Sequence, residues 1–180
     1  MLTEKRNRDM KINVRKLAVA GMMTALGVVL STFYIPVGVS KCFPIQHLLN
    51  VLAGVFLGPW YALGFSFCTA LIRNLLGTGS LLAFPGSMVG AFCCGMFYRY
   101  VKKLPAAVAG EVVGTGIIGG MLCYPVARFL MGNAEAALFT YVVPFLISTL
   151  GGSALAAVLL VILCRSKAIV VLREMLEDGK

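Results

Sequence analysis

The residues best able to do chemistry lie in one stretch, residues 73–80 (RNLLGTGS), and in its continuation at residues 84–87 (FPGS). Together they place a guanidinium, a carboxamide, hydroxyls and several glycines between long apolar runs. Polar groups of this kind are costly inside a lipid bilayer unless they face protein, water or a ligand. The stretch is therefore predicted to line the mouth of a pocket that binds a small molecule.

Further polar residues stand toward the same, outer ends of the apolar runs. Gln46 and Asn50 are four residues apart, so they share one helical face, and His47 lies between them. The other members of this set are Ser87, Tyr124, Arg128 and Tyr141. Because the chain has a single histidine and no carboxylate at ligand spacing from it, no metal site is predicted. For Arg73 and Arg128 a simpler reading also exists, in which the long side chain snorkels to the outer surface.

One carboxylate, Glu111, falls inside an apolar run, with Thr115 one turn further along the same face. A charged side chain at the centre of a membrane costs about 2.5–3.5 kcal/mol on insertion scales unless it is paired or protonated. Counted from the start of its run, Glu111 is expected in the inner half of the membrane or near its middle. A structural partner and a functional role explain it equally well.

Motifs that would indicate an enzyme are absent from the sequence. It contains no GxSxG, no HExxH and no serine, histidine and aspartate set at a plausible depth. It also contains no GxxxxGK[ST] motif, so this chain is not expected to bind ATP in a P-loop. No cofactor is predicted for the chain, and an ATP-driven process would need a separate ATPase subunit.

The elements that position these residues are predicted to be membrane-spanning helices. Of 180 residues, 59% are hydrophobic and only 13% are charged, against about a quarter in a soluble domain. Gly58-Pro59 breaks one apolar stretch into two helices. Residues 34–44, with two prolines, are expected to form a loop that can cover a pocket as a lid. The predicted helices are residues 14–33, 45–57, 60–76, 81–101, 104–131 and 136–164.

The basic residues indicate how these helices are oriented. Of the 16 Lys and Arg residues, all but Lys41, Arg73 and Arg128 precede the first run, follow the last, or lie at residues 99–103. The positive-inside rule places these flanks in the cytoplasm. We therefore predict an all-α integral membrane protein with six transmembrane helices and cytoplasmic N- and C-termini. Its parts are a basic lead-in at residues 1–13, a membrane domain at 14–165 and a tail at 166–180. The same flanks account for the net charge of +9, so nucleic acid is not an expected partner.

The first predicted helix carries small residues at helical spacing, namely Ala18, Gly21 and Ala25. Small residues let helices approach closely in a membrane. This face either packs against a helix of the same chain or docks onto a separate membrane subunit. Spacing alone favours packing within the chain.

Four segments carry longer and more specific motifs: residues 35–47 (IPVGVSKCFPIQH), 57–61 (LGPWY), 73–87 (RNLLGTGSLLAFPGS) and 110–119 (GEVVGTGIIG). With them, the chain from residue 14 to about residue 165 resembles the ThiW group of substrate-binding S-components of energy-coupling factor (ECF) vitamin transporters. The resemblance implies a six-helix S-component fold. It also implies uptake of hydroxyethylthiazole, the thiazole precursor of thiamin.

The resemblance further implies partners and a location. An S-component of this kind sits in the plasma membrane of a prokaryote and binds its substrate in the outer half, under the loop between its first two helices. It docks onto a transmembrane T-subunit by the small face of its first helix, and two ATPase subunits drive the cycle by toppling it in the bilayer. Here that face reads Gly21-Met-Met-Thr-Ala25, which departs from the common Ala-xxx-Ala pattern.

The predicted site suits such a substrate, which is neutral, heteroaromatic and has about nine non-hydrogen atoms. The candidates for an aromatic slot are Phe43, Phe84, Tyr124 and Tyr141. The candidates for hydrogen bonds are Gln46, His47, Asn50, Asn74 and Ser80. Of these, Asn74 and Ser80 are the preferred direct contacts, and Arg73 is expected to support their turn. No carboxylate is expected beside the ligand, which disfavours a cationic substrate.

Two other functions fit the sequence. A solitary carrier that couples uptake to protons through Glu111 would need no ATPase. A membrane scaffold that transports nothing would leave every ligand measurement unchanged when Asn74 or Ser80 is replaced by alanine.

Overall fold

Helices make up most of the chain in the computed structural model, which describes residues 13–37, 40–166 and 174–176. The predicted basic lead-in, apart from Asn13, and most of the predicted tail lie outside the described residues. The elements, in order, are α2 (Val14–Val29), η1 (Leu30–Thr32), β1 (Ile35–Val37), β2 (Ser40–Cys42), α3 (Pro44–Phe56), α4 (Pro59–Leu75), α5 (Ala83–Val101), α6 (Leu104–Glu111), η2 (Val112–Gly119), α7 (Gly120–Pro125), η3 (Val126–Leu130) and α8 (Val142–Arg165).

The described residues form six helical rods, two of which are composite. α2 continues into the 3-10 turn η1, and α6, η2, α7 and η3 follow one another without a break. Three rods are long and apolar enough to cross a membrane: Val14–Thr32, Leu104–Leu130 and Val142–Arg165. The prediction of a helical protein with membrane-spanning helices is confirmed to this extent. A crossing by all six rods and the orientation of the termini remain predictions.

The second and third predicted helices are separate, as expected. Gly58 has φ +87°, a left-handed backbone conformation that favours glycine. Pro59 then takes the first helical position of α4, where its missing N–H leaves no hydrogen bond unmade. The two residues therefore end one helix and begin the next.

The segment predicted as a loop at residues 34–44 contains an antiparallel hairpin. β1 pairs with β2, with Ile35 opposite Cys42 and Val37 opposite Ser40. Its β-branched residues favour extended backbone, which explains the strand pairing that the loop prediction missed. The hairpin is bound to α8, because the Phe43 N–H donates to Ser148 Oγ at 2.9 Å.

The last two rods also differ from the prediction. α8 begins at Val142 instead of residue 136, and hydrogen-bonded turns precede it. Pro144 lies in its first turn, where a proline is tolerated. The fifth rod contains two π-helical stretches, η2 and η3, in and after its glycine-rich region. Such stretches frequently occur at functional sites.

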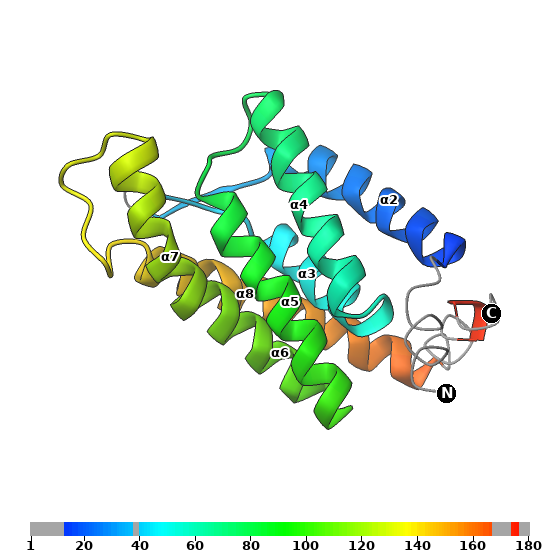
Figure 1. Ribbon diagram of the computed structural model, residues 1–180. Helices are drawn as coiled ribbons and strands as arrows, with labels where there is room; N and C mark the ends of the chain where they lie inside the picture. The colour runs from blue at the N-terminus through cyan, green and yellow to red at the C-terminus, as the bar shows by residue number, and fades with distance from the viewer. Residues whose placement is uncertain (1–12, 38–39, 167–173, 177–180) are drawn as a thin grey trace, which may run out of the picture.

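α5 is the central helix of the bundle and packs against α3, α4, α6 and η2 (Figure 1). α8 packs against α3 and η2, and α2 packs mainly against α4. Figure 1 shows the hairpin, the α4–α5 turn and the loop before α8 at one end of the bundle. The start of α2 and the α3–α4 turn lie at the other end.

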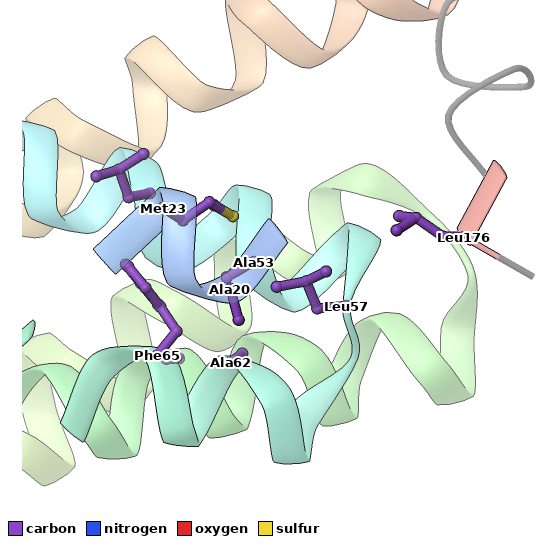
Figure 2. Packing of buried hydrophobic residues seen from close by; sticks show 9 residues of the cluster. Ala20, Met23, Ala53, Leu57, Ala62, Phe65 and Leu176 are labelled. Atoms are coloured by element: carbon purple, nitrogen blue, oxygen red, sulfur yellow. The ribbon is translucent and has the colours of Figure 1, made fainter. Parts of the chain in front are cut away.

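The main apolar core lies where α2, α3 and α4 meet (Figure 2). Several of its members are alanines, which let the helix backbones approach closely. Large apolar side chains such as Leu17, Trp60 and Phe129 are exposed instead. An apolar outer surface of this kind is expected of a protein that faces lipid. The buried members of the core are Ala20, Met23, Leu49, Ala53, Leu57, Ala62, Phe65, Ala91 and Leu176.

Candidate functional site

A cavity of about 690 Å³ lies between η1, the residues that flank the hairpin, the start of α3, the end of α4, the start of α5 and the start of α8. Its volume falls within the range of about 300–1,000 Å³ that is typical of small-molecule sites. Its wall combines four aromatic rings with many hydroxyls, one guanidinium and one imidazole, and the described wall contains no carboxylate. The lining residues are Ser31, Thr32, Tyr34, Phe43, Gln46, His47, Arg73, Gly77, Thr78, Gly79, Ser80, Leu82, Ala83, Gly86, Ser87, Thr115, Thr140, Tyr141, Pro144, Phe145 and Ser148.

The guanidinium in the wall belongs to Arg73, in the last turn of α4. Only 2% of this residue is exposed, so it does not snorkel to the outer surface. Its Nη1 donates to Oε1 of Gln46 at 2.8 Å. Its Cζ lies 4.2 Å from the ring centroid of Phe43, a cation–π arrangement. Arg73 therefore joins α4 to the start of α3 across one corner of the cavity.

The turn after α4 folds back over the backbone of Arg73. The Arg73 carbonyl accepts hydrogen bonds from the N–H groups of Thr78 and Gly79, both at 2.9 Å. Gly77 has φ +71°, which glycine adopts readily. Residues 77–80 consequently reach the cavity with their backbone close to it.

Asn74 holds this turn in place. Its Nδ2 donates to the carbonyl of Ala70 at 2.8 Å and to that of Ser80 at 3.1 Å. It does not line the cavity. The roles expected from the sequence are thus exchanged: Asn74 supports the turn, and Arg73 faces the cavity. The exchange follows from helix geometry, since adjacent residues point to different faces of α4.

A buried cluster around Glu111 lies behind the wall, and we call Glu111, His47, Asn50 and Thr115 the carboxylate cluster. Glu111 is fully buried, and three side chains hydrogen-bond to its Oε1. These are His47 Nδ1 at 2.9 Å, Asn50 Nδ2 at 3.0 Å and Thr115 Oγ1 at 3.0 Å. Asn50 and Thr115 donate to this oxygen, and His47 Nδ1 donates to it in the tautomer that carries its proton on Nδ1. The partners come from α3 and from the residues after α6, and they fix the two rods together.

Glu111 lies closer to the site than the sequence indicated, because two of its partners, His47 and Thr115, line the cavity. α3 has 13 residues, so it is about 20 Å long. Its first turn, which carries His47, packs beside Glu111. The expected depth of Glu111 in the membrane stays a prediction.

Two glycines allow this close packing. A Cβ on Gly90 of α5 would overlap Thr115 Oγ1 and lie 2.8 Å from Glu111 Oε2. A Cβ on Gly152 of α8 would overlap the carbonyl oxygen of Pro44 and lie 2.7 Å from His47 Cβ. Both distances are shorter than van der Waals contact, so the cluster and the first turn of α3 require glycine at these positions.

Several of the residues predicted to bind substrate do line the cavity: Phe43, Gln46, His47, Ser80 and Tyr141. Phe84 and Tyr124 do not. The ring of Phe84 lies against Phe67, with 5.8 Å between centroids, because α5 turns Ala83 rather than Phe84 toward the cavity. Tyr124 is half-buried on α7. Asn50 is one layer behind the wall, in the carboxylate cluster.

Sequence reasoning missed the hydroxyls that η1 and α8 contribute, of which Ser31, Thr32 and Ser148 are examples. Ser148 lines the cavity and also accepts the Phe43 N–H. A single serine in an apolar run is a weak signal, since its hydroxyl can also bond within its own helix. Its one visible sequence cue is its position four residues after Pro144 on the same helical face.

The small residues of the first helix face outward. Ala18, Gly21 and Ala25 are all exposed, and a Cβ on Gly21 would meet nothing within 4 Å. The opposite face of α2, with Ala20 and Met23, packs into the core. The small face therefore does not pack against the described part of the chain, contrary to the reading that spacing alone favoured.

The arrangement suits binding better than covalent chemistry. Within residues 13–37, 40–166 and 174–176, no three His, Cys, Asp or Glu side chains are grouped to hold a metal ion. Burial raises the pKa of the Cys42 thiol, against a smaller opposing effect of its hydrogen bond with Ser148, so this thiol is a poor nucleophile. What the wall offers is aromatic surface, hydrogen bonds and one positive charge.

In a comparison with known protein families, the family described as "Thiamine-precursor transporter protein (ThiW)" matches residues 17–166. The matched region contains every lining residue of the cavity, the carboxylate cluster and the small face of α2. Searches of the curated proteins and of the solved structures found no match.

Proposed function

The chain belongs to the ThiW family of thiamine-precursor transporters, and from this premise we propose that it is the substrate-binding S-component of an ECF importer for hydroxyethylthiazole. In this proposal it lies in the plasma membrane of a prokaryote, with six membrane-spanning helices and both termini in the cytoplasm. A transmembrane T-subunit and two ATPase subunits complete the importer. The family is one of transporters, so no catalytic activity is assigned to the chain.

The observation that carries the proposal is the cavity itself, a mixed aromatic and polar pocket within a helical membrane protein. Phe43, Tyr141 and Phe145 provide surface against which a thiazole ring can stack. His47 and Ser80 provide hydrogen-bonding groups for the ring nitrogen and the hydroxyl. A ligand of about nine non-hydrogen atoms has a binding ceiling of about −1.5 kcal/mol per atom, which permits nanomolar affinity.

Binding of hydroxyethylthiazole to the purified full-length protein in detergent or nanodiscs, measured by calorimetry, tests the substrate. We expect saturable binding with a dissociation constant well below a micromolar concentration. Thiamin serves as the comparison ligand, and its cationic ring should bind more weakly because the described wall contains no carboxylate. Failure of hydroxyethylthiazole to bind, alongside tight binding of another small metabolite, would remove this substrate and keep the class of protein.

The outward small face of α2 supports coupling to a separate T-subunit. An exposed glycine with free space around its α-carbon offers another helix a close approach. We expect Gly21→Leu or Ala25→Leu to abolish co-purification with the T-subunit and to leave hydroxyethylthiazole binding intact. Gly64→Leu is the matched control, because Gly64 is also exposed on a helix with nothing within 4 Å of its Cβ position. Equal co-purification of all three variants would argue against docking by this face.

One observation favours the rival, a solitary carrier driven by protons: the buried contact between Glu111 and His47. That function predicts uptake in cells that lack the ATPase subunits. It also predicts that Glu111→Gln removes the pH dependence of uptake. Uptake that stops without the ATPase subunits excludes the rival and agrees with the ECF proposal.

A further inference from the structure

Arg73 is a buried cation without a counter-ion in the described part of the chain. Its two contacts are the neutral amide oxygen of Gln46 and the ring of Phe43. The described residues contain one close contact between oppositely chargeable side chains, and it joins His47 to Glu111 instead. A buried charge is stable only when it is paired or well hydrogen-bonded, so an anion is expected to complete this corner.

The same corner also holds buried N–H donors without acceptors. Nε of Arg73 and Nε2 of Gln46 both lack a hydrogen-bond partner among the described residues. Both residues line the cavity, and they are 2% and 6% exposed. Buried donors are normally satisfied, so this corner of the protein is short of hydrogen-bond acceptors. Carboxylates and phosphates are acceptors only, and both match a guanidinium particularly well.

The carboxylate nearest to the site does not meet this need. Oε1 of Glu111 hydrogen-bonds to three side chains of the carboxylate cluster, and Oε2, which has no hydrogen-bond partner among the described residues, lies beside Gly90. Glu111 makes no ion pair with Arg73. The missing anion is therefore not supplied by the carboxylate cluster.

The cavity has room for a larger ligand than the thiazole alcohol. A volume of about 690 Å³ is in the range of drug-sized ligands, whereas the alcohol has only about nine non-hydrogen atoms. Ser80 of the α4–α5 turn lines the cavity with Arg73, and its hydroxyl, which accepts the Leu82 N–H, can donate to an additional oxygen. A charged group attached to the ring would thus find both space and donors.

We propose that Arg73 and Gln46 form a subsite for an acidic substituent, a carboxylate or a phosphate monoester, carried by the heteroaromatic substrate. This inference rests on the proposed function and refines its substrate class. The protein then prefers an acidic derivative of the thiazole, such as its phosphate ester or the corresponding carboxylic acid, over the free alcohol. Hydrogen bonds to a charged group correspond to a preference of about ten- to a hundredfold in affinity.

The test compares three ligands by calorimetry on the full-length protein in nanodiscs: hydroxyethylthiazole, its phosphate monoester and the carboxylic acid analogue. In the wild type, at least one acidic ligand should bind at least tenfold more tightly than the alcohol. Arg73→Gln should weaken the acidic ligands at least tenfold more than the alcohol. Arg128→Gln, which removes a charge from an exposed arginine, should change none of the three affinities.

A second variant tests the subsite independently, in case Arg73→Gln does not fold. Gln46→Glu keeps the size of the side chain and places a carboxylate within reach of the guanidinium. It should raise the thermal unfolding midpoint of the ligand-free protein and abolish the preference for acidic ligands.

Three results would overturn the subsite. The first is that hydroxyethylthiazole binds as tightly as both acidic ligands. This result would agree with the proposed substrate and contradict the subsite alone. The second is a preference for acidic ligands that survives Gln46→Glu. The third is the absence of binding by all three thiazoles, which overturns the proposed substrate as well.

Discussion

Replacing Thr115 with valine removes one donor from the carboxylate cluster while keeping the shape of the side chain. Thr115 is 1% exposed, and its hydroxyl donates to Glu111 Oε1 at 3.0 Å. A hydrogen bond to a charged group contributes about 1.5–3 kcal/mol to stability. We expect Thr115→Val to lower the free energy of unfolding by an amount in this range.

Thr69 provides a closely matched control for this substitution. It is fully buried on α4, and its hydroxyl also bonds four residues back, to the carbonyl of Phe65 at 2.8 Å. That oxygen is neutral and already accepts a helical N–H, so Thr69→Val should cost only about 0.5–1.5 kcal/mol. The expected difference between the two variants is about 1–2 kcal/mol, which corresponds to about 2–8 °C in the unfolding midpoint for a protein of this size.

The assay is thermal unfolding of both variants and the wild type in the same detergent and at one heating rate, because membrane proteins often unfold irreversibly. Thr115→Val should unfold clearly below Thr69→Val. Equal midpoints would refute the reasoning, since they would mean that the Thr115 hydroxyl does not stabilise a charged group.

Two further pairs of variants test the close packing at glycines. Gly152→Ala should weaken hydroxyethylthiazole binding at least tenfold, because its Cβ would push Pro44 and the first turn of α3 away. Gly151→Ala, next to it but with free space around its Cβ position, should bind normally in the same titration. Gly90→Ala should lower the free energy of unfolding by about 1–3 kcal/mol through overpacking against the carboxylate cluster. Gly64→Ala should be neutral or stabilise by up to about 1 kcal/mol, so equal midpoints for these two variants would count against tight packing at α5.

Local sequence signals predicted the helical rods well. Each apolar run corresponds to one rod, and the break at Gly58-Pro59 could be predicted because both residues act on their own backbone. The start of α8 and the hairpin were missed. In those places apolar composition continues across a change of backbone conformation, so composition alone could not locate the change.

The site was predictable in residue type and less so in geometry. The sequence identified His47 and Glu111 as unusual, but they are 64 positions apart, and only the packing of α3 beside the fifth rod brings them together. The burial of Arg73 depends on Gln46 and Phe43 closing over it from another segment. Contacts of this kind follow from how the helices pack, which periodicity within one helix does not specify.

α2 connects the two ends of the bundle (Figure 1). At its start, Asn13 caps the helix and also donates to the Tyr61 hydroxyl and to the Leu176 carbonyl, both at 2.8 Å. At its other end the chain continues into η1, where Ser31 lines the cavity. The helix therefore links the end of the bundle that is remote from the cavity to the rim of the cavity. A partner that binds the outward face of α2 would therefore contact a helix that leads directly to the cavity rim.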